Sequence, residues 1–270
     1  MKKKVIVTAS DFGLTKPVNE GIKWIIHNPN NILTELSLVV NAPGSEHAAE
    51  MAKTLNVNVG TCFNLTRFKP ISDQVATLTK ENGEFYKPDL GKWDFSFIEK
   101  FKEEEIKREL EAQYKWFLEK VNKKPTSIRF RKNENGDPKI LKPVAEIAKR
   151  EDIAMATPVW IWRENFSAHN FAKEKGVKLT DHVIITSPGW AHENHSIAVD
   201  ITKTDKLVET INQNNGISEV VIIAGFLDKE LLEITKTLNW QRLIPIEVIK
   251  NGELSSRLKD EFELISFSDL

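Results

Sequence analysis

Short apolar segments rich in β-branched residues alternate along this chain with longer stretches in which apolar residues recur every three or four positions. The first pattern is typical of buried parallel strands and the second of amphipathic helices. The clearest helix is predicted over 101–121. Strands are predicted at 4–8, 34–40, 58–64, 127–130, 153–156, 182–186, 219–224 and, as a late extra strand, 263–267.

This alternation predicts an α/β fold in which successive strand–helix units build a (β/α) barrel. No internal repeat or low-complexity linker divides the chain, so residues 1–270 are expected to form a single domain. The least regular segment is 66–101, which contains Pro70, Gly83, Pro88 and Gly91. We expect it to run over the barrel mouth as a loop or lid.

The first predicted strand ends in a carboxylate followed by a glycine, at Asp11 and Gly13. A (β/α) barrel carries its chemistry at the carboxyl ends of its strands. Asp11 is therefore predicted to lie at the mouth of the barrel, where a functional site would form.

The composition limits the class of protein and its expected cellular location, but it does not identify a function. The 270 residues are 40% hydrophobic and 29% charged, which is enough for one sizeable core. The net charge of −1 gives no electrostatic reason to expect a nucleic-acid or membrane partner. The single cysteine excludes an internal disulfide, and the apolar run before Ser10 is too short for a signal peptide. We expect a cytoplasmic protein.

Several short motifs resemble one known family in the same order. The segment TASDFG at 8–13 is similar to the N-A-D-D-F-G motif of the YdjC-like (ChbG-type) carbohydrate deacetylases, and GTCFNLT at 60–66 stands where that family has G-x-H-x-x-L-T. Further similar segments lie at 18–22, 32–43, 111–113, 124–126, 138–139 and 263–270. The resemblance implies a TIM-like (β/α) barrel, in a regular or an irregular, seven-stranded form, and metal-dependent deacetylation of carbohydrates.

The resemblance also places the family's three metal ligands, and only Asp11 is retained. Cys62 and Arg131 stand at the two histidine positions. A guanidinium has no lone pair for a metal and would repel a divalent cation, while one thiolate and one carboxylate make a poor zinc site. We therefore expect neither a metal nor another cofactor.

The positions that the resemblance assigns to catalysis have changed as well. Ser10 occupies the general-base position, Ile223 the catalytic histidine position, and Ala156 the position of an arginine. A serine with an ordinary pKa cannot accept a proton near pH 7. The resemblance thus implies a divergent member, a pseudoenzyme that has lost metal-dependent deacetylation.

A buried Asp11 without a metal would need another positive partner. We expect an Asp11–Arg131 salt bridge to replace the charge of the metal, with Arg129 or Lys132 nearby. The alternative is that Arg131 points to solvent and that Asp11 caps the following turn.

Two loops after predicted strands carry further candidate residues. Trp160, Trp162, Arg163 and Trp190 could stack against and bind a sugar, or the tryptophans could pack under neighbouring loops. His192, Glu193 and His195 could supply a relocated catalytic site, or they could be ordinary polar loop residues. Cys62 could act as a nucleophile with one of these histidines, or it could be buried and inert.

Three functions are compatible with these observations. The first is a binding or regulatory protein on a deacetylase-like barrel, with a small-molecule carbohydrate as its ligand. The second is a hydrolase acting on acetylated carbohydrates through a relocated or altered site. The third is an active metal deacetylase with substituted ligands. The resemblance leaves a homodimer open, because members of the family often pair.

Overall fold

The computed structural model describes residues 2–87, 95–131, 136–158, 167–186, 198–235 and 239–270. Its strands are β1 (Lys3–Phe12), β2 (Glu35–Val39), β3 (Asn58–Phe63), β4 (Ser127–Phe130), β5 (Ala154–Met155), β6 (His182–Thr186), β7 (Ala198–Val199), β8 (Ser218–Ile222) and β9 (Phe262–Ile265). Its helices are α1 (Lys16–His27), α2 (Ser45–Ala52), α3 (Glu103–Val121), α4 (Pro138–Glu151), α5 (Ala168–Glu174), α6 (Thr204–Gln213), α7 (Lys229–Ile234), α8 (Ile244–Asn251) and α9 (Glu253–Glu261).

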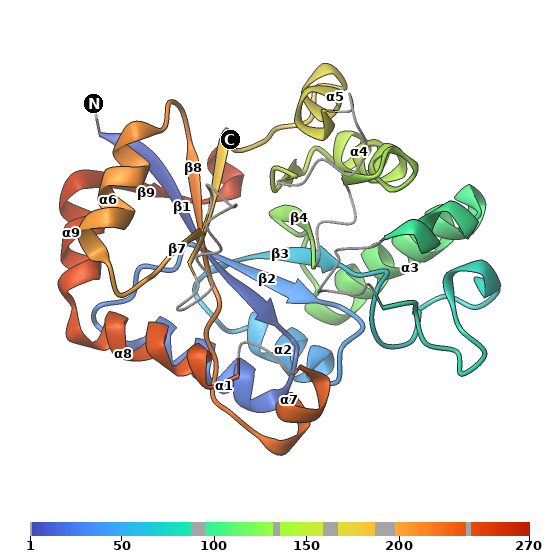
Figure 1. The fold of residues 1–270 in the computed structure, drawn as a ribbon, viewed down its shortest axis with the longest axis horizontal. Helices are drawn as coiled ribbons and strands as arrows, with labels where there is room; N and C mark the ends of the chain where they lie inside the picture. The colour runs from blue at the N-terminus through green and yellow to red at the C-terminus, as the bar shows by residue number, and fades with distance from the viewer. Residues whose placement is uncertain (1, 88–94, 132–135, 159–166, 187–197, 236–238) are drawn as a thin grey trace.

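The strands form one sheet in the order β5-β4-β3-β2-β1-β8-β6-β7, with β9 also paired to β1, and every pair is parallel. The sheet curls so that helices surround it on the outside (Figure 1). Backbone contacts between Met155 and the segment just before β6, at Lys178 and Leu179, bring the two ends of the curl together. The predicted α/β barrel-like fold is confirmed. The short strand β7 was not predicted, and β5 is shorter than expected.

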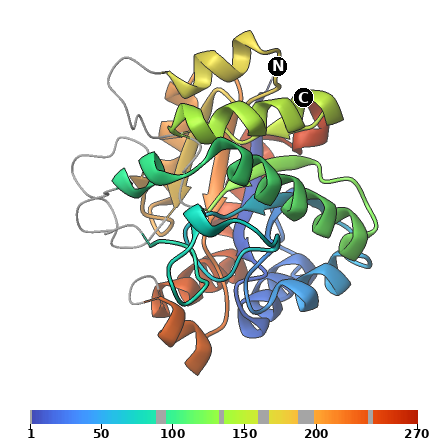
Figure 2. The same ribbon diagram turned by 90° about the vertical axis from the view of Figure 1, so that its right-hand side faces the viewer.

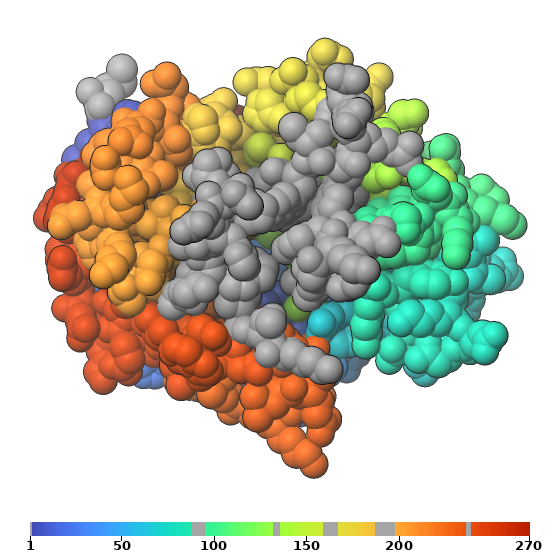
Figure 3. All heavy atoms as spheres, viewed as in Figure 1, coloured from blue at the N-terminus to red at the C-terminus, as the bar shows by residue number. Residues whose placement is uncertain are grey.

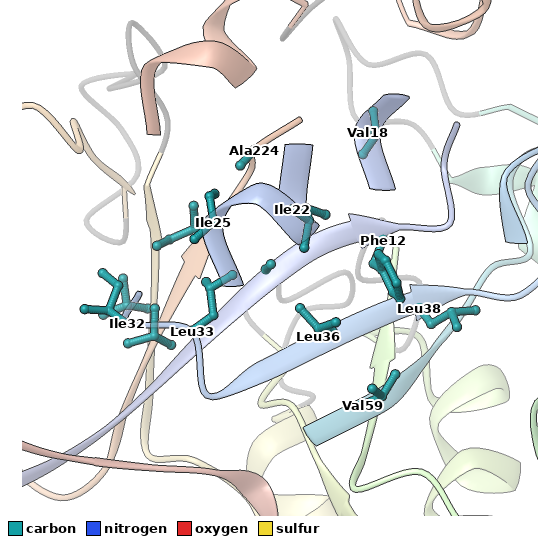
Figure 4. Close-up of a cluster of buried hydrophobic side chains, with 14 of the residues drawn as sticks. Phe12, Val18, Ile22, Ile25, Ile32, Leu33, Leu36, Leu38, Val59 and Ala224 are labelled. Carbon is teal, nitrogen blue, oxygen red and sulfur yellow. The ribbon is translucent and has the colours of Figure 1, made fainter. Parts of the chain in front are cut away.

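Apolar stripes on the helices explain how they attach to the sheet. Helix α1 begins at the Thr15 cap, whose side chain accepts a hydrogen bond from the Val18 N–H group. Its residues Val18, Ile22 and Ile25 lie one turn apart and are fully buried. Figure 4 shows these side chains against Phe12 of β1 and residues of β2 and β3. This packing fixes the carboxyl end of β1.

A second core lies between the sheet and helices α3 and α4, which run side by side (Figure 2). The described part of the segment predicted as an irregular loop belongs to this core. It contains two 3₁₀ helices, η1 (Ala76–Leu78) and η2 (Ser96–Lys100), and it buries Leu78 and Phe85 completely. The Glu109 carboxylate on α3 accepts hydrogen bonds from the Ile71 and Ser72 N–H groups at 2.9 and 2.8 Å. This part is therefore packed on α3 rather than an open loop.

The barrel interior is closed at the amino-terminal end by an apolar plug. Ile6, Ala154, Ala156 and Ile265 pack there with Phe267 of the 3₁₀ helix η5 (Phe267–Asp269). No helix in the described ranges is long and apolar enough to cross a lipid bilayer.

Above the plug lies a layer of buried polar side chains that point into the barrel. Arg129 forms a salt bridge with Glu219, and the Thr8 hydroxyl donates to the same carboxylate. Arg129, considered a neighbour of Asp11 from the sequence, is thus paired elsewhere. Glu35 accepts hydrogen bonds from the hydroxyls of Thr126 and Ser127.

Glycine is required beside Glu35. A Cβ atom at Gly60 would lie 2.0 Å from the Ser127 Oγ and 3.0 Å from the Glu35 Oε1. Burial raises the pKa of Glu35 from its ordinary value near 4.5 to about 7, despite the two hydroxyl donors that oppose the shift. Glu35 is therefore largely protonated in mildly acidic solution while it remains folded.

This shift predicts a pH-dependent stability. Between pH 4.5 and about 7 the folded chain keeps the Glu35 proton that the unfolded chain releases, so the free energy of unfolding falls as the pH rises through this window. The full effect is on the order of 3 kcal/mol. Glu35→Gln, which is neutral at every pH, should lack this component. Urea unfolding across the window measures it.

The exposed Glu103→Gln on α3 is the matched control and should keep the wild-type slope. Parallel curves of unfolding free energy against pH for Glu35→Gln and the wild type would contradict the prediction.

Candidate functional site

Asp11 lies where strand β1 departs from regular geometry. The register between β1 and β2 shifts between Ala9 and Phe12, and Asp11 itself has a φ angle of 63°. A bulge of this kind re-aims a side chain at the end of a strand, and aspartate tolerates the left-handed region better than most residues. The backbone thus sets the direction of the carboxylate.

The loop after Asp11 is fixed by a buried asparagine from α1. The Asn19 Oδ1 atom accepts a hydrogen bond from the Gly13 N–H group at 2.6 Å, and its Nδ2 atom donates to the Gly44 carbonyl at 2.9 Å. One side chain therefore ties the loop after β1 to the loop after β2. Asn19 lies in the segment 18–22 that resembles the family, and its hydrogen bonds hold the backbone of both loops in place.

Two buried arginines share the Asp11 carboxylate. The Arg242 Nη2 atom lies 2.6 Å from one carboxylate oxygen, and the Arg131 Nε atom lies 3.4 Å from the other. The Arg131 and Arg242 side chains are only 4% and 2% exposed, and that of Asp11 is 12% exposed. These three groups form an ionic cluster that is largely shielded from bulk water.

Each arginine reaches Asp11 from a different part of the barrel rim. Arg131 follows β4 directly, and its backbone N–H group donates to the Phe63 carbonyl at 3.0 Å. Arg242 lies on the 3₁₀ helix η4 (Trp240–Leu243), whose position is tied to the loop after β8 because the Arg242 carbonyl accepts from the Gly225 N–H group at 3.2 Å.

The predicted Asp11–Arg131 salt bridge is confirmed, and the alternative of a solvent-pointing Arg131 is wrong. Arg242 was not predicted, although it makes the shorter contact. It is 231 residues away from Asp11 in the chain and lies on a single short turn. No hydrophobic period or motif marks such a position. Only the requirement for a second cation beside a buried carboxylate could have suggested it.

Cys62 lies within β3, close to the same cluster, and is 1% exposed. Burial is the main cause that raises the pKa of its thiol to about 12; the nearby Asp11 carboxylate adds to it, and Arg129 and Arg131 oppose it. The thiol is therefore protonated at neutral pH. This environment favours the interpretation of Cys62 as buried and inert over that of a nucleophile or metal ligand.

Ser10 and Ile223 lie at the carboxyl ends of neighbouring strands. β1 and β8 are paired with Ala9 opposite Ile222, so the next residues along the two strands are Ser10 and Ile223. Both are half-buried. The structure thus brings the two family positions together at the barrel mouth, but a hydroxyl and a sec-butyl side chain offer neither a base nor an acid of suitable pKa.

These residues do not fit a divalent metal. The only carboxylate among the three ligand positions is already paired with two guanidinium groups, one of which occupies a ligand position itself. The second position is a protonated thiol. Across the described ranges, no three His, Cys, Asp or Glu side chains are grouped so that they could hold a metal ion.

A third arginine, Arg67, stands close to the cluster from the loop after β3. Burial and, to a smaller extent, the charge of Arg131 lower the pKa of its guanidinium to about 10, against the opposing effect of Asp11. The Arg67 side chain donates to the Ile234 carbonyl, and its own carbonyl accepts from the Asn64 side chain at 2.8 Å. The sequence did not single out this residue.

The loop that carries Arg67 is held by α3. The Gln113 side chain accepts from the Asn64 N–H group at 3.0 Å and donates to the Asn64 carbonyl at 2.8 Å. Gln113 and Asn64 are both fully buried. Like Asn19, they lie in segments that resemble the family, and their hydrogen bonds hold the backbone of the rim in place.

The other candidate residues lie outside the part of the chain that the structure describes. This applies to the possible neighbour Lys132 and to both aromatic and histidine loops: Trp160, Trp162, Arg163, Trp190, His192, Glu193 and His195.

Known proteins resemble the chain over its whole length. It is 28% identical to a carbohydrate deacetylase of Brevibacillus brevis over 269 residues, which cover 99% of each protein. It is 29% identical to a chitooligosaccharide deacetylase of Proteus mirabilis over 271 residues, or 98% of each. Among solved structures, a putative cellobiose-phosphate cleavage protein from Enterococcus faecalis V583 superposes with a TM-score of 0.81 at 20% identity, covering 100% of this chain and 99% of that one.

The structural similarity at that identity shows the fold alone. The family follows from the sequence, because residues 4–264 match the model of the YdjC-like protein family. This chain therefore belongs to the YdjC-like family.

Proposed function

We propose that this chain is a member of the YdjC-like family that binds a saccharide or sugar derivative and has lost metal-dependent deacetylation. The observation that carries the proposal is the pairing of Asp11 with Arg131 and Arg242. In the relatives' mechanism, as the resemblance implies it, the corresponding carboxylate would bind the metal. Here two fixed cations already neutralise it.

The chemistry of the remaining positions supports the same conclusion. A divalent cation beside Arg131 would meet a like charge in a poorly solvated setting, where repulsion is strong. Cys62 would have to lose a proton from a thiol whose pKa is about 12 before it could bind a metal. Ser10 and Ile223 supply no group that could activate water or protonate a leaving amine.

The ligand class rests on the relatives. Proteins similar along the entire chain are called carbohydrate and chitooligosaccharide deacetylases. The loops bearing Trp160, Trp162, Arg163 and Trp190 follow predicted strands, so we propose them as the surfaces that stack against the sugar. The proposed setting is the cytoplasm, and the proposed state is either a monomer or a homodimer.

A second function is a hydrolase whose site has moved to His192, Glu193 and His195. It differs from the first in one measurable respect, because such an enzyme would release acetate without a metal. Acetate release that survives chelation and is lost in His192→Ala would favour it over the binding function.

We expect the purified chain to contain a divalent metal only far below one ion per molecule, and to release no acetate from acetylated chitooligosaccharides. The reason is the occupation of Asp11 by guanidinium groups. Metal analysis by plasma mass spectrometry, with an acetate assay before and after chelator treatment, provides the measurement. The Brevibacillus brevis relative, purified in parallel, is the positive control. Stoichiometric metal together with chelator-sensitive acetate release would overturn the proposal.

The carboxylate of Asp11 should contribute to stability rather than to metal binding. Asp11→Asn removes the negative charge between two buried arginines, and we expect it to lower the free energy of unfolding by about 3 kcal/mol. Chemical denaturation in metal-free buffer measures the loss.

Asp152→Asn is a matched control for that substitution. Asp152 also has a positive φ angle and also contacts a cation, Lys178 at 3.4 Å, but its side chain is 80% exposed. Its substitution should change the unfolding free energy by less than about 0.5 kcal/mol. Equal stability of Asp11→Asn and the wild type would show that the ionic cluster does not replace a metal.

A further inference from the structure

We propose that the mouth of the barrel binds the oxyanion of its ligand, a carboxylate or a phosphate group, through Arg131 and Arg67, with the Asp11–Arg242 pair as a fixed support. This inference rests on the proposed function, because it names the chemical class of the ligand in the same site. The proposed site is the position at which the resemblance places a metal cation in the relatives. In this chain the same position would bind an anion instead.

The charges around Asp11 are unbalanced. Arg131 and Arg242 contact its carboxylate directly, and Arg67 lies close enough for its titration to be affected by both Arg131 and Asp11. Among the described residues, two guanidinium groups thus contact one carboxylate, and Arg67 lies near them while it also lines a cavity with three glutamates. Arg129 does not change this balance, because its charge is met by Glu219 in the layer below. Excess charge in a poorly solvated place is costly unless a counter-ion joins it.

Arg131 retains hydrogen-bonding capacity that nothing in the described ranges uses. Its Nε and Nη1 atoms are buried and have no hydrogen-bond partner there, although the side chain is 96% removed from solvent and Nε is near Asp11. Buried donors are normally satisfied, and an unsatisfied one indicates a missing partner. A guanidinium offers parallel donors in a plane, which match the two oxygens of a carboxylate or two oxygens of a phosphate.

Arg67 supplies a second cation of the same kind. With a pKa of about 10 it remains protonated at neutral pH, even though burial and the neighbouring Arg131 both oppose its charge. Two like charges held near each other are stabilised by an anion between them. The side chain is anchored on the Ile234 carbonyl, so its guanidinium is positioned in advance of binding.

The surroundings of Arg67 indicate on which side the anion lies. Arg67 also lines a cavity of about 300 Å³ whose charged residues include Glu84, Glu230 and Glu233 against Lys87. The three carboxylates disfavour an anion in that cavity, whereas the other charges that influence Arg67 are those of Arg131 and Asp11. The unused buried donors of Arg131 therefore mark the side of Arg67 on which we place the anion.

A sugar carboxylate and a sugar phosphate could both bind to these arginines, and the experiment distinguishes the two kinds of ligand. Isothermal titration at low salt would compare glucose 6-phosphate, glucuronate, inorganic phosphate and uncharged glucose as probes. We expect at least one of the three anions to bind at least about tenfold more tightly than glucose, and added salt to weaken that binding. Preference for glucuronate identifies a carboxylate ligand, and preference for glucose 6-phosphate or phosphate identifies a phosphate ligand.

Substitutions locate the anion. Arg131→Met and Arg67→Met should each weaken binding of the preferred anion at least about tenfold, because each removes a charged donor. Arg131→Lys keeps the charge without the parallel donors and should fall between Arg131→Met and the wild type. Arg150→Met is the control, since Arg150 pairs with Glu111 on the surface, and its affinity should equal that of the wild type. If Arg131→Met does not fold, Arg67→Met decides the matter alone.

Two results would overturn the inference. The first is the absence of binding by all three anions, or equal affinity for glucose and the anions. The second is an anion affinity unchanged in Arg67→Met. Binding of uncharged chitooligosaccharides with no preference for an anion would contradict this inference but would leave the proposed function supported. Stoichiometric metal with acetate release would instead remove the proposed function itself.

Discussion

The contact between one carboxylate and two guanidinium groups determines how the mouth of this barrel behaves. Asp11 is held by the backbone bulge of β1 in a place with little water, so it requires a positive partner close at hand. Arg242 and Arg131 each take one of its oxygens. Because both oxygens of Asp11 are taken, the site does not fit a divalent metal, and it carries more positive than negative charge. The protonated thiol of Cys62 nearby is a second reason why a metal does not fit.

The barrel interior contains different charged groups at its bottom, in its middle layer and at its rim. At the bottom, Ile6 and Phe267 exclude charge altogether. In the middle layer, Arg129 is balanced by Glu219 and the Glu35 carboxyl is held by two hydroxyls. At the rim, the described part of the chain places two arginines, Arg131 and Arg242, on the single carboxylate of Asp11. Figure 3 shows segments from the two halves of the chain on opposite sides of the face seen there, with α3 in green on one side and α6 in orange on the other.

The fold and part of the site were predictable from the sequence because they depend on local patterns. Buried β-branched runs marked most of the strands, and a carboxylate at the end of the first strand marked the rim. The need to neutralise Asp11 correctly identified Arg131. Arg242 and Arg67 could not be found in this way, because each lies on an irregular segment whose neighbours in space are distant in the chain. Glu35 and Glu219 were missed for another reason: charged residues in strands usually indicate an exposed face, whereas these point into the barrel.

Residues of two kinds meet at the rim of the barrel. Asn19, Asn64 and Gln113 hydrogen-bond to backbone and keep the rim loops in place. Ser10 and Ile223, at the positions that the resemblance assigns to catalysis, offer no group for proton transfer near neutral pH. The rim is therefore held by buried polar contacts around two positions that supply neither an acid nor a base.

The Asp11–Arg242 contact has a consequence for redesign of this rim. With Arg131 replaced by histidine, Arg242 would still hold one oxygen of the same carboxylate at 2.6 Å, so that oxygen would stay paired. With Arg242 replaced instead, Arg131 alone would face a carboxylate that lies in a place with little water. A metal site could therefore be built at Asp11 only by changing both arginines together.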